Sequence, residues 1–239
     1  MILALTTAVL LWLASGLKKD AVPELPDGTK PVQSEAAAQG ATQPGLWDSA
    51  PEFEVEDLSD GLCVTDVGSY AGIYMEDGSD EPVSNVLMMV LENTSEKDLQ
   101  LARIQLAYSD FTAEFEATNL PAGESVVLLE KNRRDASEEE YQSAVTSDVV
   151  FFDEPMSLQE DHLSVSGYNG GIQVTNISDG DISGDIVIYY KNSAGELLYG
   201  GITYRARVEG GIAAGETARI MTGHYTPDHC RILWITCSE

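Results

Sequence analysis

The sequence predicts an all-β protein built from two β-sandwich units in tandem. Short runs of alternating apolar and polar residues, which are typical of half-buried strands, recur after residue 57. Turn residues separate these runs at intervals of roughly 8–12 residues, a spacing typical of sandwich folds. A set of strand and turn motifs also occurs twice in the same order, which indicates an internal repeat.

The repeat has three parts: an Asn-x-Ser turn after an apolar strand, a strand that ends in Tyr, and an Ala-Gly-Glu turn. Their markers are Asn93, Tyr108 and Gly123 in the first copy, and Asn176, Tyr190 and Gly215 in the second. The tyrosine and the glycine are 15 residues apart in the first copy and 25 in the second. We attribute the longer spacing to an additional hairpin at residues 192–199, around Asn-Ser-Ala-Gly.

The amino-terminal part has a different character. Residues 1–17 form an uncharged apolar run, which predicts a signal peptide or a membrane anchor helix. Lys18 and Lys19 follow it and, taken alone, favour a cytoplasmic position for that flank. The acidic, β-rich remainder favours export instead. Residues 18–57 contain five prolines and no strand or helix period, so they predict a disordered linker.

The charge is strongly acidic: 13 basic and 40 acidic residues give a net charge of −27. This balance argues against a nucleic-acid partner, because a phosphate binder needs a basic face. Residues 58–155, the predicted first sandwich, carry 21 acidic and 5 basic residues, a net charge of −16. Residues 156–239, the predicted second sandwich, have a net charge of −5. Either solubility or an attraction for cations explains the excess.

Two local features of the first unit lead to further expectations. The turn at residues 76–81 holds four carboxylates, from Glu76, Asp77, Asp80 and Glu81. We expect these charges to repel one another and to attract a cation or a basic partner. Residues 135–141 begin with a capping Asp followed by Glu residues, so they predict a helical turn.

The second unit resembles the FxLYD type of bacterial extracytoplasmic domain. The likeness rests on four segments, which are 174–176, 186–190, 192–196 and 214–217. It covers about residues 165–239 and extends more loosely to 83–152. The Phe-x-Leu-Tyr-Asp core is replaced here by Ile-Val-Ile-Tyr-Tyr. The resemblance implies an immunoglobulin-like sandwich on an exported or membrane-tethered protein, and it transfers no catalytic residue to this chain.

Calcium is the one cofactor for which the sequence offers a candidate site. Asp179, Asp181 and Asp185 occupy a loop whose first half follows the spacing of an EF-hand, with Gly184 at its sixth position. The bidentate Glu that the twelfth position needs is replaced by Tyr190, inside a predicted strand. A polar inter-strand turn explains the same residues, so no metal ligand is assigned.

The remaining patterns assign no catalytic residue. Histidines and cysteines near the carboxyl end lack the closely spaced pairs of a zinc site. Cys230 and Cys237 lie on one predicted strand, roughly 23 Å apart if extended, so they are too distant for a disulfide. We expect these two and Cys63 to be small buried residues.

From these patterns we expect a membrane-tethered or secreted protein of the cell envelope with a non-catalytic role in binding or spacing. Its expected partners are the membrane, through residues 1–17 if they are retained, and another envelope protein or a cationic partner. Two alternatives stay open: a hydrolase or enzyme accessory whose site is formed by acidic loops, and a divalent-cation-binding module.

Overall fold

The computed structural model describes residues 47–49, 56–58, 61–136 and 139–238, and within them the chain is all-β, as expected. No α-helix occurs in these residues, and none of their segments is a helix able to cross a membrane. The predicted leader at 1–17 and most of the predicted linker at 18–57 lie outside the described residues.

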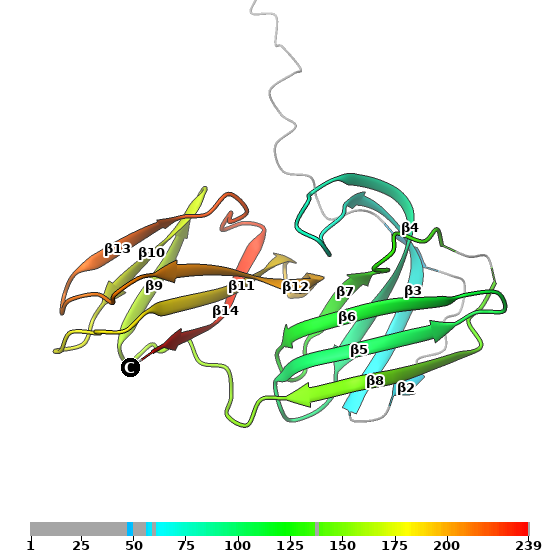
Figure 1. Ribbon diagram of the computed structural model, residues 1–239, viewed down its shortest axis with the longest axis horizontal. Helices are drawn as coiled ribbons and strands as arrows, with labels where there is room; N and C mark the ends of the chain where they lie inside the picture. Colours follow the sequence, from blue (N-terminus) through cyan, green and yellow to red (C-terminus); the bar gives the residue numbers. More distant parts are fainter. Residues whose placement is uncertain (1–46, 50–55, 59–60, 137–138, 239) are drawn as a thin grey trace, which may run out of the picture. The chain divides into compact units, whose positions relative to one another are not determined.

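The first strand group forms two facing layers. One layer has the order β1-β3-β4-β7, with β2 also paired to β3, and the other has the order β6-β5-β8. Figure 1 shows β5, β6 and β8 crossing over β3, β4 and β7. The strands are β1 (Trp47–Ser49), β2 (Glu56–Leu58), β3 (Leu62–Ile73), β4 (Pro82–Asn93), β5 (Leu99–Ala107), β6 (Thr112–Leu120), β7 (Ser125–Leu129) and β8 (Ser143–Phe151).

The second strand group repeats this order in six strands. One layer is β13-β10-β9 and the other is β12-β11-β14, so β9 to β14 correspond to β3 to β8. The strands are β9 (Leu163–Tyr168), β10 (Gly171–Asn176), β11 (Ile186–Ala194), β12 (Leu197–Val208), β13 (Thr217–Met221) and β14 (Cys230–Cys237). The sandwich-like layering is therefore present in both groups. Independent folding of 58–155 and 156–239 stays a prediction.

The Asn-x-Ser and Ala-Gly-Glu motifs meet in space and form the same turn in both groups. Asn93 and Asn176 are fully buried, and each side-chain amide ties two distant backbone segments together. Each Oδ1 accepts from the N–H and the hydroxyl of the serine two residues later. The amide donors contact Lys97 O (2.9 Å) and Leu120 O (3.1 Å) in the first group, and Gly180 O (2.8 Å) and Ile212 O (2.9 Å) in the second.

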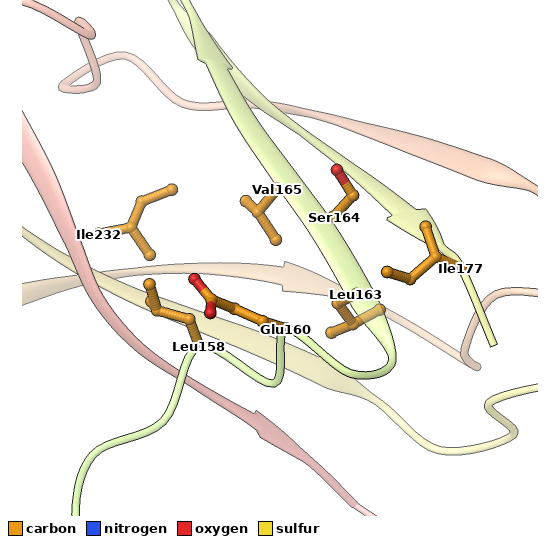
Figure 2. Close-up of a pocket in the computed structure, with 7 residues that line it drawn as sticks. All are labelled: Leu158, Glu160, Leu163, Ser164, Val165, Ile177 and Ile232. Carbon is orange, nitrogen blue, oxygen red and sulfur yellow. The ribbon is translucent and has the colours of Figure 1, made fainter.

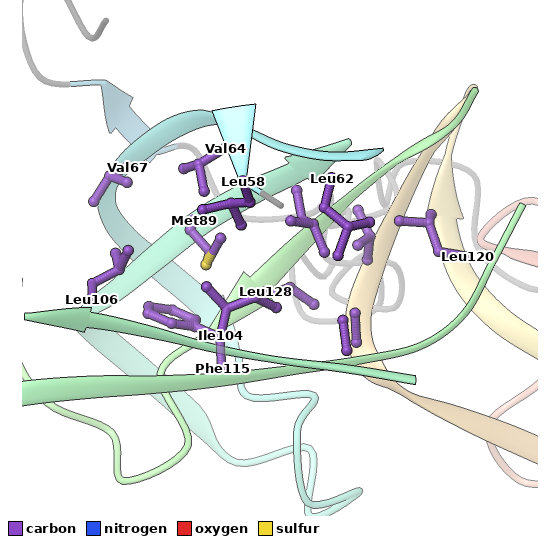
Figure 3. Close-up of a cluster of buried hydrophobic side chains, with 14 of the residues drawn as sticks. Leu58, Leu62, Val64, Val67, Met89, Ile104, Leu106, Phe115, Leu120 and Leu128 are labelled. Atoms are coloured by element: carbon purple, nitrogen blue, oxygen red, sulfur yellow. The ribbon is translucent and has the colours of Figure 1, made fainter. Parts of the chain in front are cut away.

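The core of the first group follows from the period-two alternation of its strands. In β5, Ile104 and Leu106 are fully buried. Arg103 of the same strand faces solvent, where it forms an ion pair with Glu116 of the neighbouring strand β6. Figure 3 shows Leu58 of the short strand β2 lying with Leu62 and Val64 of β3 in this core.

The central strand β4 is buried on both faces. Its continuous apolar run, residues 86–91, contributes alternately to two clusters, one between the layers and one on the outer face of the β3-β4-β7 layer. The outer cluster includes Tyr199 of β12, with Ala194 and Leu197 packed against it. The end of the β11–β12 hairpin therefore covers a surface of the first group.

Three local predictions need correction. The hairpin predicted at residues 192–199 is present, but it is not additional, because it is the extended end of the β11–β12 hairpin that corresponds to β5–β6. The described residues of 135–141, which are all but 137 and 138, form no helical turn. Asp135 bridges Val86, and Ala136 N donates to Asn85 O, so backbone pairing beside β4 overrides the local capping pattern. Cys237 is exposed, whereas Cys63 and Cys230 are buried as expected.

Candidate functional site

The two strand groups are joined by direct strand pairing. β12 pairs in parallel with β7 through Leu198–Val126 and Tyr199–Val127, which makes one eight-stranded sheet from layers of both groups. Only a hairpin longer than β5–β6 brings residues 198 and 199 to this position. The longer spacing seen in the second sequence copy therefore builds the joint.

A buried lysine is the polar centre of this joint. Lys191 lies in β11 with none of its surface exposed. Its Nζ donates to the carbonyl oxygens of Gly200, Gly201 and Ile202 at 2.8, 2.8 and 2.7 Å, so all three ammonium protons are used. Burial lowers the pKa of Lys191, and the negative charge of Glu76 opposes this shift.

Glu76 approaches the same backbone from the first group. Its carboxylate accepts from the N–H of Leu129 at 2.8 Å and of Gly201 at 2.7 Å. Burial raises the pKa of Glu76, while these two hydrogen bonds and the charge of Lys191 act in the opposite direction. Gly201 is required at this place, because a Cβ would lie 1.7 Å from the carbonyl oxygen of Glu116.

The other carboxylates of the 76–81 turn have partners from distant segments. Arg133 donates to Asp77 Oδ2 at 2.7 Å and to Glu81 Oε2 at 2.6 Å. Asp80 Oδ2 lies 2.9 Å from His224 Nδ1 of the second group. These long-range partners reduce the repulsion among charges that are adjacent in sequence, and the expected attraction for a cation or a basic partner stays a prediction.

Two of the three candidate calcium ligands accept hydrogen bonds from the distant segment at residues 210–214. Asp181 Oδ1 accepts from Ala214 N at 2.8 Å, and Asp185 Oδ1 accepts from Gly210 N at 2.8 Å. The second bond is the main reason that the pKa of Asp185 is lowered. Asp179 is exposed. In the described part of the chain, no group of three or more His, Cys, Asp or Glu side chains is placed to hold a metal ion. Calcium binding stays an untested prediction.

Asp80, His224 and Cys230 combine residue types that serve nucleophilic catalysis. The ring of His224 bonds to Asp80 and stacks on Tyr204, with centroids 5.0 Å apart. The thiol of Cys230, however, donates to the backbone carbonyl of His224 at 3.3 Å. Burial raises the pKa of this thiol, which favours its unreactive protonated form. These contacts support packing of the second group and not an activated nucleophile.

An apolar groove of about 370 Å³ lies in the second group, beside the edge strand β9. Figure 2 shows Leu158 and Ile232 at one end, Ile177 at the other, and residues of β9 between them. The lining residues are Leu158, Glu160, Leu163, Ser164, Val165, Ile177 and Ile232. The groove has the size of a small ligand site.

The groove occupies a place that is covered in the first group. Leu62 of β3 lies opposite Asn93, and Leu163 of β9 lies opposite Asn176, so the outer edges of β3 and β9 are equivalent. The edge of β3 is paired with β1 and β2, and Leu58 stands opposite Leu62. Among the described residues, β9 has no strand on the corresponding side.

Sequence patterns did not identify the joint or the groove. Lys191 directly follows the apolar run 186–190 in β11, and the Gly200–Gly201 pair comes next along the hairpin. Together they were a local sign that a charge is buried close to the backbone. Nothing local identified the groove, because its lining comes from the segment before β9, from β9, from Ile177 directly after β10 and from β14.

No family model matches the chain, and no curated protein or solved structure matches it.

Proposed function

We propose that this chain is an extracytoplasmic protein, membrane-anchored through residues 1–17 or secreted, that serves as a non-catalytic spacer and binding scaffold at the cell envelope. The resemblance of its second unit to FxLYD-type domains supports the location. The acidic surface and the predicted Pro-rich linker agree with a folded part held away from an anionic membrane.

The observation that carries the proposal is the joint. A single sheet passes through both strand groups, and Lys191 and Glu76 bond to the same glycine from opposite groups. Buried polar contacts of this kind are costly to separate, because each partner then loses its hydrogen bonds. A chain joined in this way acts as one body and sets a fixed separation between whatever binds at each group.

Distance measurement by spin labelling tests the spacer role. Labels are placed at exposed positions in each group through Val145→Cys and Met221→Cys, in a Cys237→Ser background. We expect one narrow distance distribution, and a broader one after Lys191→Met. A broad distribution in the parent protein would show independent groups and contradict the proposal.

Fractionation of cells that express the full-length chain tests the location separately. We expect the protein in the membrane or external fraction, digested by protease added to intact cells. Recovery in the cytosol, protected from that protease, would contradict export.

A further inference from the structure

The free edge of β9 presents unpaired backbone groups next to the apolar groove. Ile177 N donates to His162 O at 2.9 Å, so residues 162 and 177 are a hydrogen-bonded pair of the β9–β10 ladder. In an antiparallel ladder such pairs alternate with non-bonded ones. The N–H and C=O groups of Val165 and Gly167 therefore point away from β10, along the edge that no described strand covers.

The apolar surface beside this edge is unusually exposed. Leu158 is 37% exposed and Ile177 is 53% exposed, and both line the groove. The segment before β9 leaves the edge open, because it follows β14 instead: Ile235 N donates to Ser157 O at 2.8 Å. Edge backbone and exposed apolar surface together are the features that strand addition uses.

The first group shows what such an edge accepts. Strand β2 pairs with β3 in the equivalent place, and its Leu58 is only 9% exposed, in contact with the core. Glu160 lines the groove of the second group and Asp161 follows it, both exposed, and residues 156–239 have a net charge of −5. Charge complementarity therefore favours a basic occupant.

We propose that β9 and its groove bind an extended peptide segment of a partner protein by strand addition. The segment carries apolar side chains at alternate positions, which fill the groove, and a basic side chain that pairs with Glu160. This binding is independent of the spacer role, since it uses neither Lys191 nor Glu76.

Fluorescence anisotropy with the full chain tests this proposal. The probe is a labelled hexapeptide of sequence Lys-Leu-Lys-Val-Thr-Ile, and two further peptides carry N-methyl groups on one or the other set of alternate residues. Strand addition uses the N–H groups of only one set. We therefore expect one N-methylated peptide to bind at least about tenfold more weakly and the other to bind like the parent.

Matched variants locate the site. Ile177→Ser should weaken binding about tenfold, whereas Val145→Ser, at a similarly exposed position of β8, should leave it unchanged. Glu160→Gln should weaken binding of the basic peptide, whereas Glu196→Gln in the exposed hairpin turn should not. Val165→Pro should abolish binding, and its thermal melt shows whether the fold is retained.

Three outcomes would overturn the proposal: no binding of the basic peptide, equal loss with both N-methylated peptides, or no effect of Ile177→Ser. Sedimentation of the chain alone provides a fourth. A dimer that Ile177→Ser dissociates would assign the groove to a second copy of this chain. A broad spin-label distribution would contradict the spacer role and leave these outcomes unaffected.

Discussion

The two strand groups have the same strand order and the same buried asparagine turn, but they differ at two places. The second group has the longer hairpin, which pairs with β7 of the first. The first group has an edge covered by β1 and β2, and the second has an open edge with an apolar groove. The shared parts maintain the fold of each group. The joint and the groove come from the parts that differ between the two groups. We therefore base the functional hypotheses on those parts.

The joint predicts the largest effect on stability. Lys191→Met removes the donor for three buried carbonyls and the positive charge near Glu76. We expect a loss of about 3–5 kcal/mol in the free energy of unfolding of the full chain, measured by urea denaturation. The control is Lys131→Met, because Lys131 forms a half-exposed ion pair with Glu116 and should change stability by at most about 1 kcal/mol. Equal losses would mean that the joint contributes no more than an ordinary surface contact.

The shared asparagine turn predicts similar effects in both groups. Asn93→Ala and Asn176→Ala each leave buried carbonyls without a donor. We expect each variant to lose about 2–3 kcal/mol in urea denaturation, since an unsatisfied buried group costs about 1–3 kcal/mol. Asn169→Ala, at an exposed turn, is the control and should stay within about 0.5 kcal/mol. A large loss of stability for only one of the two variants would show that the two asparagine turns do not contribute equally to the stability of the chain.

The covered and open edges predict losses of stability of different size when a leucine is removed. Leu58→Ala should destabilise the chain by about 2 kcal/mol, because Leu58 is in the core of the first group. Leu158→Ala should cost less than about 1 kcal/mol, because Leu158 is already partly exposed at the groove. Thermal or urea unfolding measures both. If the Leu158 variant lost as much stability as the Leu58 variant, Leu158 would be as well packed as Leu58, which would contradict an uncovered edge at β9.

The acidic turn predicts a smaller effect whose sign depends on Arg133. In the parent chain, salt screens the favourable contacts of Arg133 with Asp77 and Glu81. In Arg133→Gln the same carboxylates repel one another, so salt should raise the melting temperature of this variant more than that of the parent. Arg219→Gln is the control, since Arg219 donates to the neutral Gln173. An unchanged salt response in Arg133→Gln would show that this turn is simply solvated.

The smallest expected effect is on acid stability. The pKa of Asp77 is lowered, first by hydrogen bonds from Ser79 and then by Arg133. A carboxyl whose folded pKa is depressed contributes stability above its ordinary value, and this contribution is lost as pH falls through the folded value. Asp77→Asn should therefore flatten the decline of melting temperature below pH 4, relative to Asp110→Asn at another exposed turn. Parallel curves for the two variants would contradict a role for Asp77.

Local sequence patterns were sufficient to predict the all-β class and the internal repeat. Alternation of apolar and polar residues and glycine turns are local signals, which is why Cys230 and Cys237 were correctly placed on one strand. The joint, the pairing of the acidic turn and the open edge depend on contacts between segments that are distant in the sequence. Glu76 and Gly201 are 125 positions apart, and the groove combines four segments. Hydrogen bonds and burial at such separations depend on how strands pair, which no local pattern records.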